Sequence, residues 1–437
     1  MEAILSSQSV DTDVLSPSLK YGLDASGSWC TGKREATVYA LGSSYSPGGV
    51  KMISVPFGST SEWLVPESVL FSANFTNDSS TLACFPATPD ANCLFERIDI
   101  RCGGQLIESI TESARCNELF TRLTMSPQKK INMAQVGFGT QIALAEPDWS
   151  SASNHNAGTV PAATTKRIHW KCNLSGILSQ HRWIPLYSLS GMGLVCNFYL
   201  APKTESMILS DSGVTYSQDF TLTDVKAHAT LQTIDDNLME SFQGQLLNGT
   251  ALRIPIKKIE SIYSYVPNSV TSGKFDVPMS RAYTRLCSLF CSFVQEPPAD
   301  GSGKAKLCNT FYTHTASAET LSYSLQLGTR RVPDNDVVGF GESWHRLLNA
   351  VGIGGSLSHA TGITYGDYAT SSYAICCDTE KISHLASTGE NLSATSTIFL
   401  KLAGFGTQAS HLPSRAHLIA QTDAVVEIRD STVELFE

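Results

Sequence analysis

The residues of this chain whose types and spacing could do chemistry are few. Gly339-Phe-Gly341 and Gly352-Ile-Gly-Gly355 resemble fragments of phosphate-binding loops. Neither segment completes the required glycine spacing between a strand and a helix, and no acidic residue follows at the distance that would bind a ribose. We therefore interpret both segments as ordinary loop glycines.

Two charged clusters could bind ions, and both have a simpler interpretation. Asp334-Asn-Asp336 offers oxygen ligands for a hard cation, but no carboxylate follows at the spacing of a calcium loop. We expect a turn leading into a helix there, because Asp and Asn are favoured at such positions. Arg330-Arg331 could contact an anion. We expect these arginines to form salt bridges at a domain edge or an inter-subunit edge instead.

The remaining candidates for catalysis or metal binding are isolated. The ten histidines form no HxxxH or HExxH pair, which argues against a zinc site. Ser190 and Ser356 lie outside any GxSxG nucleophile elbow. Trp149 is a single large aromatic residue in a long loop, where it suits an interface as well as a ligand. The sequence therefore predicts no catalytic residue, no cofactor-binding residue and no metal ligand, and favours a protein that is not an enzyme.

Composition favours a protein that covers much of its own surface with partners. The chain has 437 residues, of which 42 % are hydrophobic and only 16 % charged, and its net charge is −9. Two all-β domains of roughly 200 residues each suit this length. A charge content this low indicates extensive buried or partner-covered surface. The negative net charge argues against sequence-specific or general nucleic-acid binding, which needs a basic surface.

Cysteine usage and the N-terminus predict synthesis in the cytosol. The twelve cysteines contain no CxxC pair, and buried free thiols are the simplest interpretation. Met1 to Leu5 lacks the basic flank and apolar core of a signal peptide. The longest apolar stretch, Leu286 to Val294, is too short to span a bilayer and reads as a strand covered on both faces. We expect a soluble protein without a transmembrane segment.

The stretch from Tyr216 to Pro255 organises the chain. Apolar and polar residues alternate from Phe220 onward, with one slip at Thr223-Asp224 that predicts a β-bulge. Asp235 then caps a helix predicted over 236–247, and Asn248-Gly249 ends that helix. Alternation resumes at Leu252. We interpret this helix as a hinge between two β domains.

The two halves on either side of this hinge resemble each other. In each half an apolar strand ends in proline, at Pro56 and Pro255, and a Val-Pro pair opens the next strand, at Pro66 and Pro278. In each half an alternating strand is followed by an amphipathic helix. We predict the first helix from Ser113 or Glu112 to Met125 and the second over 342–351. This repeat predicts two copies of one β domain. The many short strands, without alternating helices, indicate that each copy is a β-sandwich.

Four stretches carry a resemblance to a known family. They are Leu174-Ser-Gly-Ile-Leu-Ser-Gln-His-Arg-Trp-Ile-Pro-Leu186, Phe220 to Gly249, Leu325-Gln-Leu-Gly-Thr-Arg-Arg-Val-Pro333 with Glu342-Ser-Trp-His-Arg-Leu-Leu, and Val425-Val-Glu-Ile-Arg-Asp430. With them the chain resembles the double jelly-roll major capsid proteins of eukaryotic double-stranded DNA viruses, in the lineage of polinton-like viruses, virophages and large DNA viruses. The resemblance covers most of the chain from Asn173 onward. The earlier part matches only through the internal repeat.

This resemblance implies a fold and a division of the chain. The fold is all-β, with two tandem eight-stranded jelly-roll sandwiches, each carrying a short helix insertion and joined by a helical linker. Residues 1–33 would be an N-terminal arm, 34–235 the first jelly roll, 236–249 the linker helix and 250–437 the second jelly roll. The long loops 126–165 and 296–309 would form outward towers or trimer contacts.

The resemblance also implies a function without catalysis. Three chains would form a pseudo-hexagonal capsomer, and capsomers would tile an icosahedral capsid of the virion. The implied partners are further copies of the chain, neighbouring capsomers, penton and minor capsid proteins, and an internal membrane. Two alternatives remain open from the sequence. One is a carbohydrate-binding or carbohydrate-active tandem β-sandwich protein, and the other is a minor capsid or spike protein of the same fold.

Overall fold

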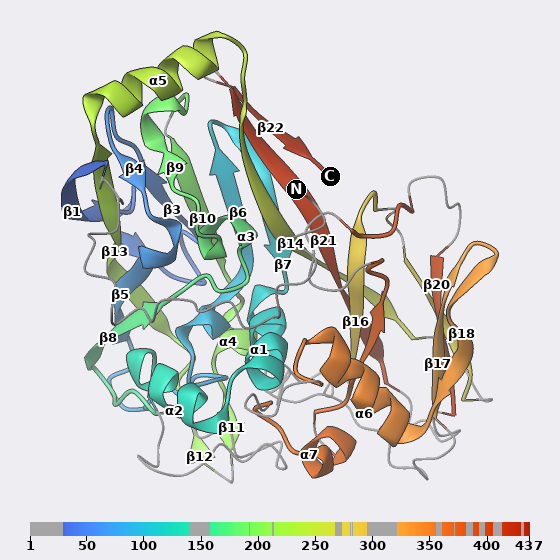
Figure 1. Ribbon diagram of the computed structural model, residues 1–437. Coiled ribbons are helices and arrows are strands. Elements are labelled where there is room, and N and C mark those ends of the chain that lie inside the picture. Colours follow the sequence, from blue (N-terminus) through green and yellow to red (C-terminus); the bar gives the residue numbers. More distant parts are fainter. Residues whose placement is uncertain are drawn as a thin grey trace, which may run out of the picture.

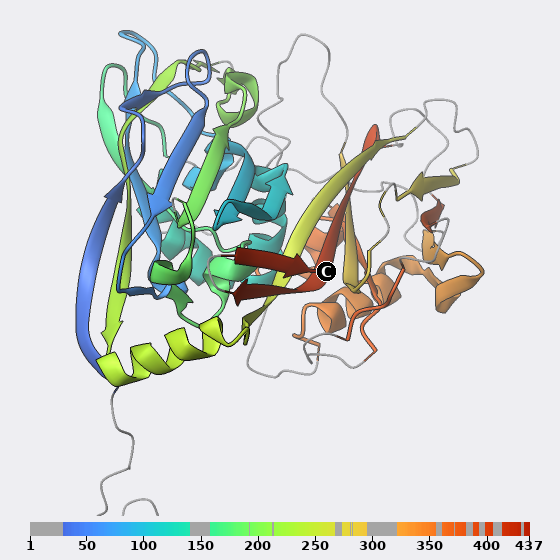
Figure 2. The ribbon, with the colours of Figure 1, turned by 90° about the horizontal axis from the view of Figure 1, so that it is seen from above.

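Two β-sandwiches lie side by side in the computed structural model, joined by a long helix at one end (Figure 1, Figure 2). The structure describes residues 29–139, 158–191, 193–211, 214–266, 273–279, 281, 283–294, 321–354, 361–370, 372–381, 388–392, 398–404, 413–429 and 432–437. Trp149, Ser356, Cys308, the loop 296–309 and most of the predicted arm lie outside these residues.

The first half consists of two facing sheets. One has the order β8-β5-β13 and continues to β4 and β9, while β1 and β2 also pair with β13. The other has the order β3-β10-β6-β7. The strands of this half are β1 (Cys30–Tyr39), β2 (Ser44–Tyr45), β3 (Met52–Phe57), β4 (Trp63–Leu64), β5 (Leu70–Asn77), β6 (Phe95–Cys102), β7 (Gln105–Thr111), β8 (Thr165–Trp170), β9 (Ile184–Pro185), β10 (Leu194–Leu200), β11 (Ser210–Asp211), β12 (Val214–Thr215) and β13 (Phe220–Ile234).

The second half repeats this arrangement. Its sheets have the orders β14-β21-β16-β19 and β15-β20-β17-β18, and β22 pairs with β21. Its strands are β14 (Leu252–Tyr265), β15 (Phe275–Pro278), β16 (Leu286–Val294), β17 (Ser322–Leu327), β18 (Arg330–Val338), β19 (Ala374–Asp378), β20 (Ile398–Ala403), β21 (Arg415–Arg429) and β22 (Thr432–Phe436). The helices of the chain are α1 (Ser113–Thr124), α2 (Pro127–Val136), α3 (Gly176–Ser179), α4 (Lys203–Ser206), α5 (Asp236–Leu247), α6 (Gly339–Ala350) and α7 (Tyr365–Thr370).

Eight strands of each half correspond one to one. The sheet β1-β13-β5-β8 matches β14-β21-β16-β19, and the sheet β3-β10-β6-β7 matches β15-β20-β17-β18, in chain order as well as in space. Each half is therefore an eight-stranded jelly roll, as predicted. β1 begins at Cys30, inside the segment 1–33 predicted as an arm. The limits 34–235, 236–249 and 250–437 as separate folding units remain a prediction.

The prolines used to detect the repeat were paired incorrectly. Pro56 lies in β3 opposite Val195, and its structural counterpart is Pro278, which lies in β15 opposite Phe399. Pro255 lies in β14, and Pro66 begins a short 3₁₀ turn before β5. The repeat itself is confirmed. Proline is tolerated on edge strands, and β3, β14 and β15 are all edges of their sheets, so Val-Pro-type patterns recur at positions that do not correspond.

The central stretch folds as predicted. β13 contains the expected bulge, because its register against β5 shifts between Thr223 and Lys226, and Asp224 adopts a left-handed φ of 48°. The Asp235 side chain accepts a hydrogen bond from the backbone N–H of Asn237 at the start of α5. Gly249, with φ 82°, follows the end of this helix. Helix α5 crosses one end of the molecule from the first jelly roll to the second (Figure 1).

Helices α1 and α6 occupy the same place in the two strand orders. Each directly follows a hairpin, β6–β7 in the first half and β17–β18 in the second. Helix α6 begins at Gly339, three residues before the predicted Glu342. The reason is local, because Gly339 has φ 78° and its N–H donates to the carbonyl of Leu321, which turns the chain from β18 directly into the helix.

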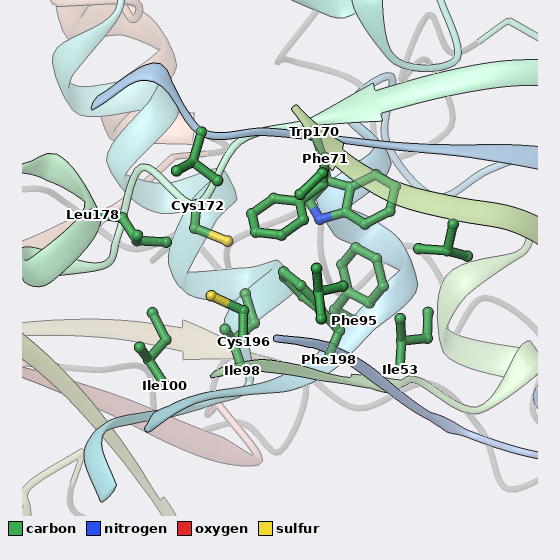
Figure 3. Close-up of a cluster of buried hydrophobic side chains, with 14 of the residues drawn as sticks. Ile53, Phe71, Phe95, Ile98, Ile100, Trp170, Cys172, Leu178, Cys196 and Phe198 are labelled. Atoms are coloured by element: carbon green, nitrogen blue, oxygen red, sulfur yellow. The ribbon is translucent and has the colours of Figure 1, made fainter. Parts of the chain in front are cut away.

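The hydrophobic core of the first jelly roll is aromatic. Phe71 and Trp170 from one sheet pack against Phe95 and Phe198 from the other, with ring centroids of Phe71 and Phe198 4.8 Å apart (Figure 3). Strand β16 is buried along its whole length, as its apolar sequence predicted. None of the helices in the described part of the chain is long and apolar enough to cross a membrane.

Candidate functional site

The glycine segments singled out in the sequence belong to helix termini. Gly339 and Gly341 form the first turn of α6. Gly352 follows the end of α6 with φ 80°, and its N–H donates to the carbonyl of Asn349. Gly352 therefore turns the backbone as a loop glycine, as interpreted, whereas Gly339 and Gly341 lie in the helix and not in a loop. Gly355 lies outside the described residues. Ser190 donates its hydroxyl to the carbonyl of Gly103, which is a turn contact.

The charged segment 330–336 is a strand. Asp334 and Asp336 lie within β18, so the predicted turn leading into a helix was wrong. The segment forms an edge strand whose side chains are largely exposed, which accommodates this run of charges without a turn. Arg330 pairs with Glu390 at 3.3 Å, and Arg331 pairs with Asp336. The predicted salt bridges are thus present within the chain.

The cysteines among the described residues carry free thiols. Ten of them are buried, and Cys30 is partly exposed. Burial raises the pKa of thiols such as Cys93 and Cys116 to about 12, so they are poor nucleophiles. Cys172 and Cys196 point toward each other inside the first jelly roll (Figure 3). Among the described residues no group of three or more His, Cys, Asp or Glu side chains is placed to hold a metal ion.

One open hollow of about 400 Å³ lies on the surface of the first jelly roll. Its charged lining residues include Lys51, Asp78, Lys203 and Asp219. Lys203 and Asp219 already pair at 2.8 Å, and the hollow lacks an aromatic platform beside these charges apart from Phe220, which is buried. We assign no chemistry to it.

The most distinctive site in the structure is the contact between the two jelly rolls, which we call the junction. Helix α1 of the first half lies between its own jelly roll and the sheet β14-β21-β16-β19 of the second half. The apolar side chains of this amphipathic helix, Cys116, Leu119 and Leu123, belong to the hydrophobic cluster of the second half. The rings of Phe120 and Phe290 meet across the junction with centroids 5.2 Å apart.

Helix α1 also brings charged side chains into the junction. Arg115, Glu118 and Arg122 are each at most 2 % exposed. Glu118 and Arg122 form an ion pair at 3.0 Å, and Arg122 donates to the hydroxyl of Ser372 at 2.8 Å. Charges at three- and four-residue spacing on an amphipathic helix normally face solvent, so their burial could not be predicted from the sequence pattern.

The C-terminal end of α1 is held by the loop between α6 and α7. The N–H of Gly362 donates to the carbonyl of Arg122 at 2.9 Å. A Cβ atom at position 362 would lie 2.4 Å from the carbonyl oxygen of Met125, so only glycine allows this approach. The first jelly roll therefore supplies helix α1, and the second jelly roll encloses it.

The edges of the two jelly rolls meet beside α1. β7, the last strand in its sheet, lies next to β14, the first strand of the second half, and Thr111 donates its hydroxyl to the carbonyl of Ser261 at 3.0 Å. Glu108 on β7 accepts hydrogen bonds from the Ser175 hydroxyl and from the N–H of Gly176. Burial raises the pKa of Glu108 to about 7, an effect that these two bonds partly offset.

The counterparts of these junction elements are bare. Strand β18 corresponds to β7, and β1 corresponds to β14, yet both β18 and β1 expose most of their residues. Helix α6 exposes Glu342, His345 and Asn349, whereas the same face of α1 is covered. Unpaired edge strands are uncommon on a monomer because they invite pairing with another chain.

The outer face of the first sheet is polar and ordered. Arg167 donates to the hydroxyl of Ser72 at 2.9 Å and pairs with Asp224 at 3.1 Å, and Lys226 pairs with Asp224 at 2.9 Å. The hydrogen bonds from Lys226 and Arg167 lower the pKa of Asp224. Partial burial and these two cations lower the pKa of His228, which lies 3.2 Å from Ser72.

Comparison with known proteins gives no match to a protein family by sequence profile and none to a curated protein. Solved structures do match. PBCV-1 VP54, fitted into a reconstruction of the virophage Sputnik, has a TM-score of 0.63 at 11 % identity, and the match covers 92 % of this chain and 96 % of that chain.

Two further structures match along nearly the whole chain. The Faustovirus major capsid protein has a TM-score of 0.62 at 8 % identity, covering 95 % of this chain and 93 % of its own. A chain of the Sputnik virophage has a TM-score of 0.59 at 9 % identity, covering 97 % and 92 %. The chain therefore has the double jelly-roll fold of viral major capsid proteins.

Proposed function

We propose that this chain is the major capsid protein of an icosahedral virus. The observation that carries the proposal is the extent of the structural match, which includes both jelly rolls and the junction between them rather than one sandwich. The match covers more than nine-tenths of this chain and of each capsid chain described above. The carbohydrate-binding alternative finds no support in these comparisons.

We infer further that three chains form the capsomer. Within one chain, edge β7 of the first jelly roll lies against edge β14 of the second, and α1 fills the space between them. The equivalent edges, β18 of the second jelly roll and β1 of the first, are exposed. If β18 of one chain lies against β1 of the next, six similar jelly rolls close into a ring of three chains, as a heterologous contact with a closing rotation does.

The two ends of the molecule differ in a way that suits a shell. β13 runs toward α5, so Phe220 and its neighbour Thr165 at the start of β8 lie at the far end. Val294 pairs with Arg415 at the same far end of the second half. Thr165 and Val294, which adjoin the loops 126–165 and 296–309 in sequence, thus lie at the end opposite α5, and this supports a role for these loops as outward towers or trimer contacts.

Strand β1, which follows the predicted arm, begins at the other end. Cys30 pairs with Ile234 immediately before α5, so β1 begins beside that helix. This placement supports a role for the arm on the inner face or in contact with neighbours. Contacts with penton proteins, minor capsid proteins and an internal membrane, and synthesis in the host cytosol, belong to the same proposal.

Light scattering on the purified chain tests the capsomer. We expect a particle of three times the 47.1 kDa of one chain, with a hexagonal outline in negative stain. A chain that remains monomeric across salt and pH would contradict the capsomer.

A single variant tests the proposed edge contact. Val338, at the end of β18, is 51 % exposed, and we expect Val338→Arg to weaken the trimer while the chain stays folded by circular dichroism. Leu247 on α5 is 75 % exposed. Leu247→Arg is therefore the matched control and should leave the trimer intact. Trimers unaffected by Val338→Arg would place the contact elsewhere.

A further inference from the structure

The junction buries a histidine whose ring has no hydrogen-bond partner. His417 lies on β21, is 1 % exposed, and neither of its ring nitrogens has a partner among the described residues. Its neighbours across the sheet are Ser292 on β16 and Tyr263 on β14. The Ser292 hydroxyl is also buried without a partner. A buried imidazole without hydrogen bonds is stable only in its neutral form.

Two arginines act on the charge of the His417 ring. Arg115 faces it from α1, and Arg415 lies two residues earlier on the same face of β21. The carboxylate of Glu112, which begins the turn into α1, lies 3.6 Å from Arg415. Strands β14 and β16 contribute Tyr263, whose ring lies under Arg415, and Ser292. Glu118 and Arg122, further along α1, pair with each other.

We propose that His417 is an acid-operated latch between the two jelly rolls. While its ring is neutral, the ring packs in the closed contact between α1 and β21. Protonation places a further positive charge beside Arg115 and Arg415, on a ring that has no hydrogen-bond partner among the described residues. Separation of α1 from β21 lets water reach the charged ring and so lowers the free energy of the protonated chain. The junction then opens, while the sheets of each jelly roll stay intact.

The sign of the effect follows from the two states of the ring. An exposed histidine titrates near pH 6.5. Burial, with Arg115 and Arg415, holds the pKa of His417 well below that value in the closed junction. Below pH 6.5 the open junction therefore gains a proton that the closed one does not. The equilibrium constant for opening then rises up to tenfold per pH unit, or about 30-fold between pH 7.5 and 5.0.

A second titrating group in the junction acts in the opposite direction. Glu108, with a pKa near 7, binds a proton more readily in the closed junction than when exposed, so acid favours closure through this residue. The pH profile of the natural chain is the sum of both effects. The contribution of His417 is therefore measured as a ratio of two equilibrium constants for opening. One is that of the natural chain, and the other is that of a variant that cannot titrate at position 417.

Hydrogen exchange on the full chain, read by mass spectrometry and corrected for intrinsic exchange rates, tests the latch. We compare the natural chain with His417→Phe at pH 7.5, 6.5, 5.5 and 5.0. The matched control is His181→Gln, which removes a histidine whose side chain is 91 % exposed. We expect the ratio of opening between the natural chain and His417→Phe to rise about 30-fold toward pH 5.0 in 113–124 and 415–421. In β5 this ratio should not change.

Three results would overturn the latch. The ratio could stay constant with pH, it could change equally in β5, or His181→Gln could have the same effect as His417→Phe. If the Phe ring does not fit, His417→Gln keeps the comparison, because it is close in size and does not titrate. As regulation of the capsomer, the latch rests on the proposed function. The exchange test does not, since it needs neither trimers nor shells, so a failed latch would leave the capsid proposal standing.

Discussion

Helices α1 and α6 follow the same hairpin in the two jelly rolls but have opposite surroundings. In α1 nearly every residue is buried, including three charged ones, because the second jelly roll covers the face that points away from the first. In α6 the apolar side packs on its own half, and Glu342, His345 and Asn349 remain exposed. The two helices differ in what covers their outer face. The second jelly roll covers α1, whereas no part of the chain among the described residues covers α6 in this way.

This comparison indicates what an assembled neighbour would do. Two ion pairs of the same Glu-to-Arg spacing show it directly. Glu118 and Arg122 are 3 % and 1 % exposed at their side chains, whereas Glu342 and Arg346 are 42 % and 40 % exposed. Both pairs follow from the four-residue spacing of Glu and Arg in the sequence. The pair Glu118–Arg122 is buried only because the sheet of the second jelly roll covers it.

The largest expected effect comes from breaking the buried pair. Arg122→Leu removes the ion pair of the buried Glu118 carboxylate with Arg122 and the bond from Arg122 to Ser372. We expect a loss of about 3 to 5 kcal/mol in the free energy of unfolding, measured by urea denaturation. The double variant Glu118→Leu with Arg122→Leu should cost less than the single one. An equal or larger cost in the double variant would show that packing, not the stranded charge, decides the effect.

The next effect concerns pH. Glu108 has its folded pKa raised to about 7 from an ordinary value of 4.5, so its contribution to stability is complete below pH 4.5 and is lost as the pH rises through 7. Relative to Glu108→Gln, the natural chain should lose about 3 kcal/mol of unfolding free energy between pH 4.5 and pH 8. Urea denaturation at both pH values measures it. Parallel pH profiles for the two proteins would contradict the burial of a protonated carboxyl.

A smaller effect tests how closely the halves approach. A Cβ at Gly176 would lie 2.3 Å from the carbonyl oxygen of Lys257 on β14, so Gly176→Ala must push the halves apart. We expect a cost of about 1 to 3 kcal/mol by thermal or urea unfolding. Gly244→Ala is the control, because nothing lies within 4 Å of that site and the residue is inside α5. It should stabilise the chain by about 0.5 to 1 kcal/mol.

The smallest effect is expected from the exposed pair. Arg346→Ala removes a surface partner of Glu342, and we expect a change of about 0.3 to 0.5 kcal/mol in the dissociated chain. In the assembled trimer the same change should cost more if the neighbour covers α6. Urea denaturation of the dissociated chain and of the trimer gives the two values. Equal costs in both would show that α6 stays exposed after assembly and would weaken the proposed contact.

Much of the fold could be predicted from the sequence. The alternation of β13, the slip at Thr223-Asp224, the cap at Asp235 and the end at Gly249 are local patterns, and the structure has each where the pattern put it. The buried strand β16 followed from an apolar run with no polar face. These predictions succeeded because each depends on neighbours within a few residues.

The junction could not be predicted in this way. Arg115, Glu118 and Arg122 occupy ordinary positions on an amphipathic helix, and His417 lies in an alternating strand like many others. The pairing of Pro56 with Pro255 was wrong for the same reason. A proline indicates an edge strand, but it does not indicate which edge strand of the sandwich contains it. Sequence alone thus determined most of the elements, the repeat and the helix that joins its two halves, although not the strand at Asp334 and Asp336. Which charges are buried, and which edges are left bare, was decided by the tertiary contact, because burial depends on the face that a distant part of the chain covers.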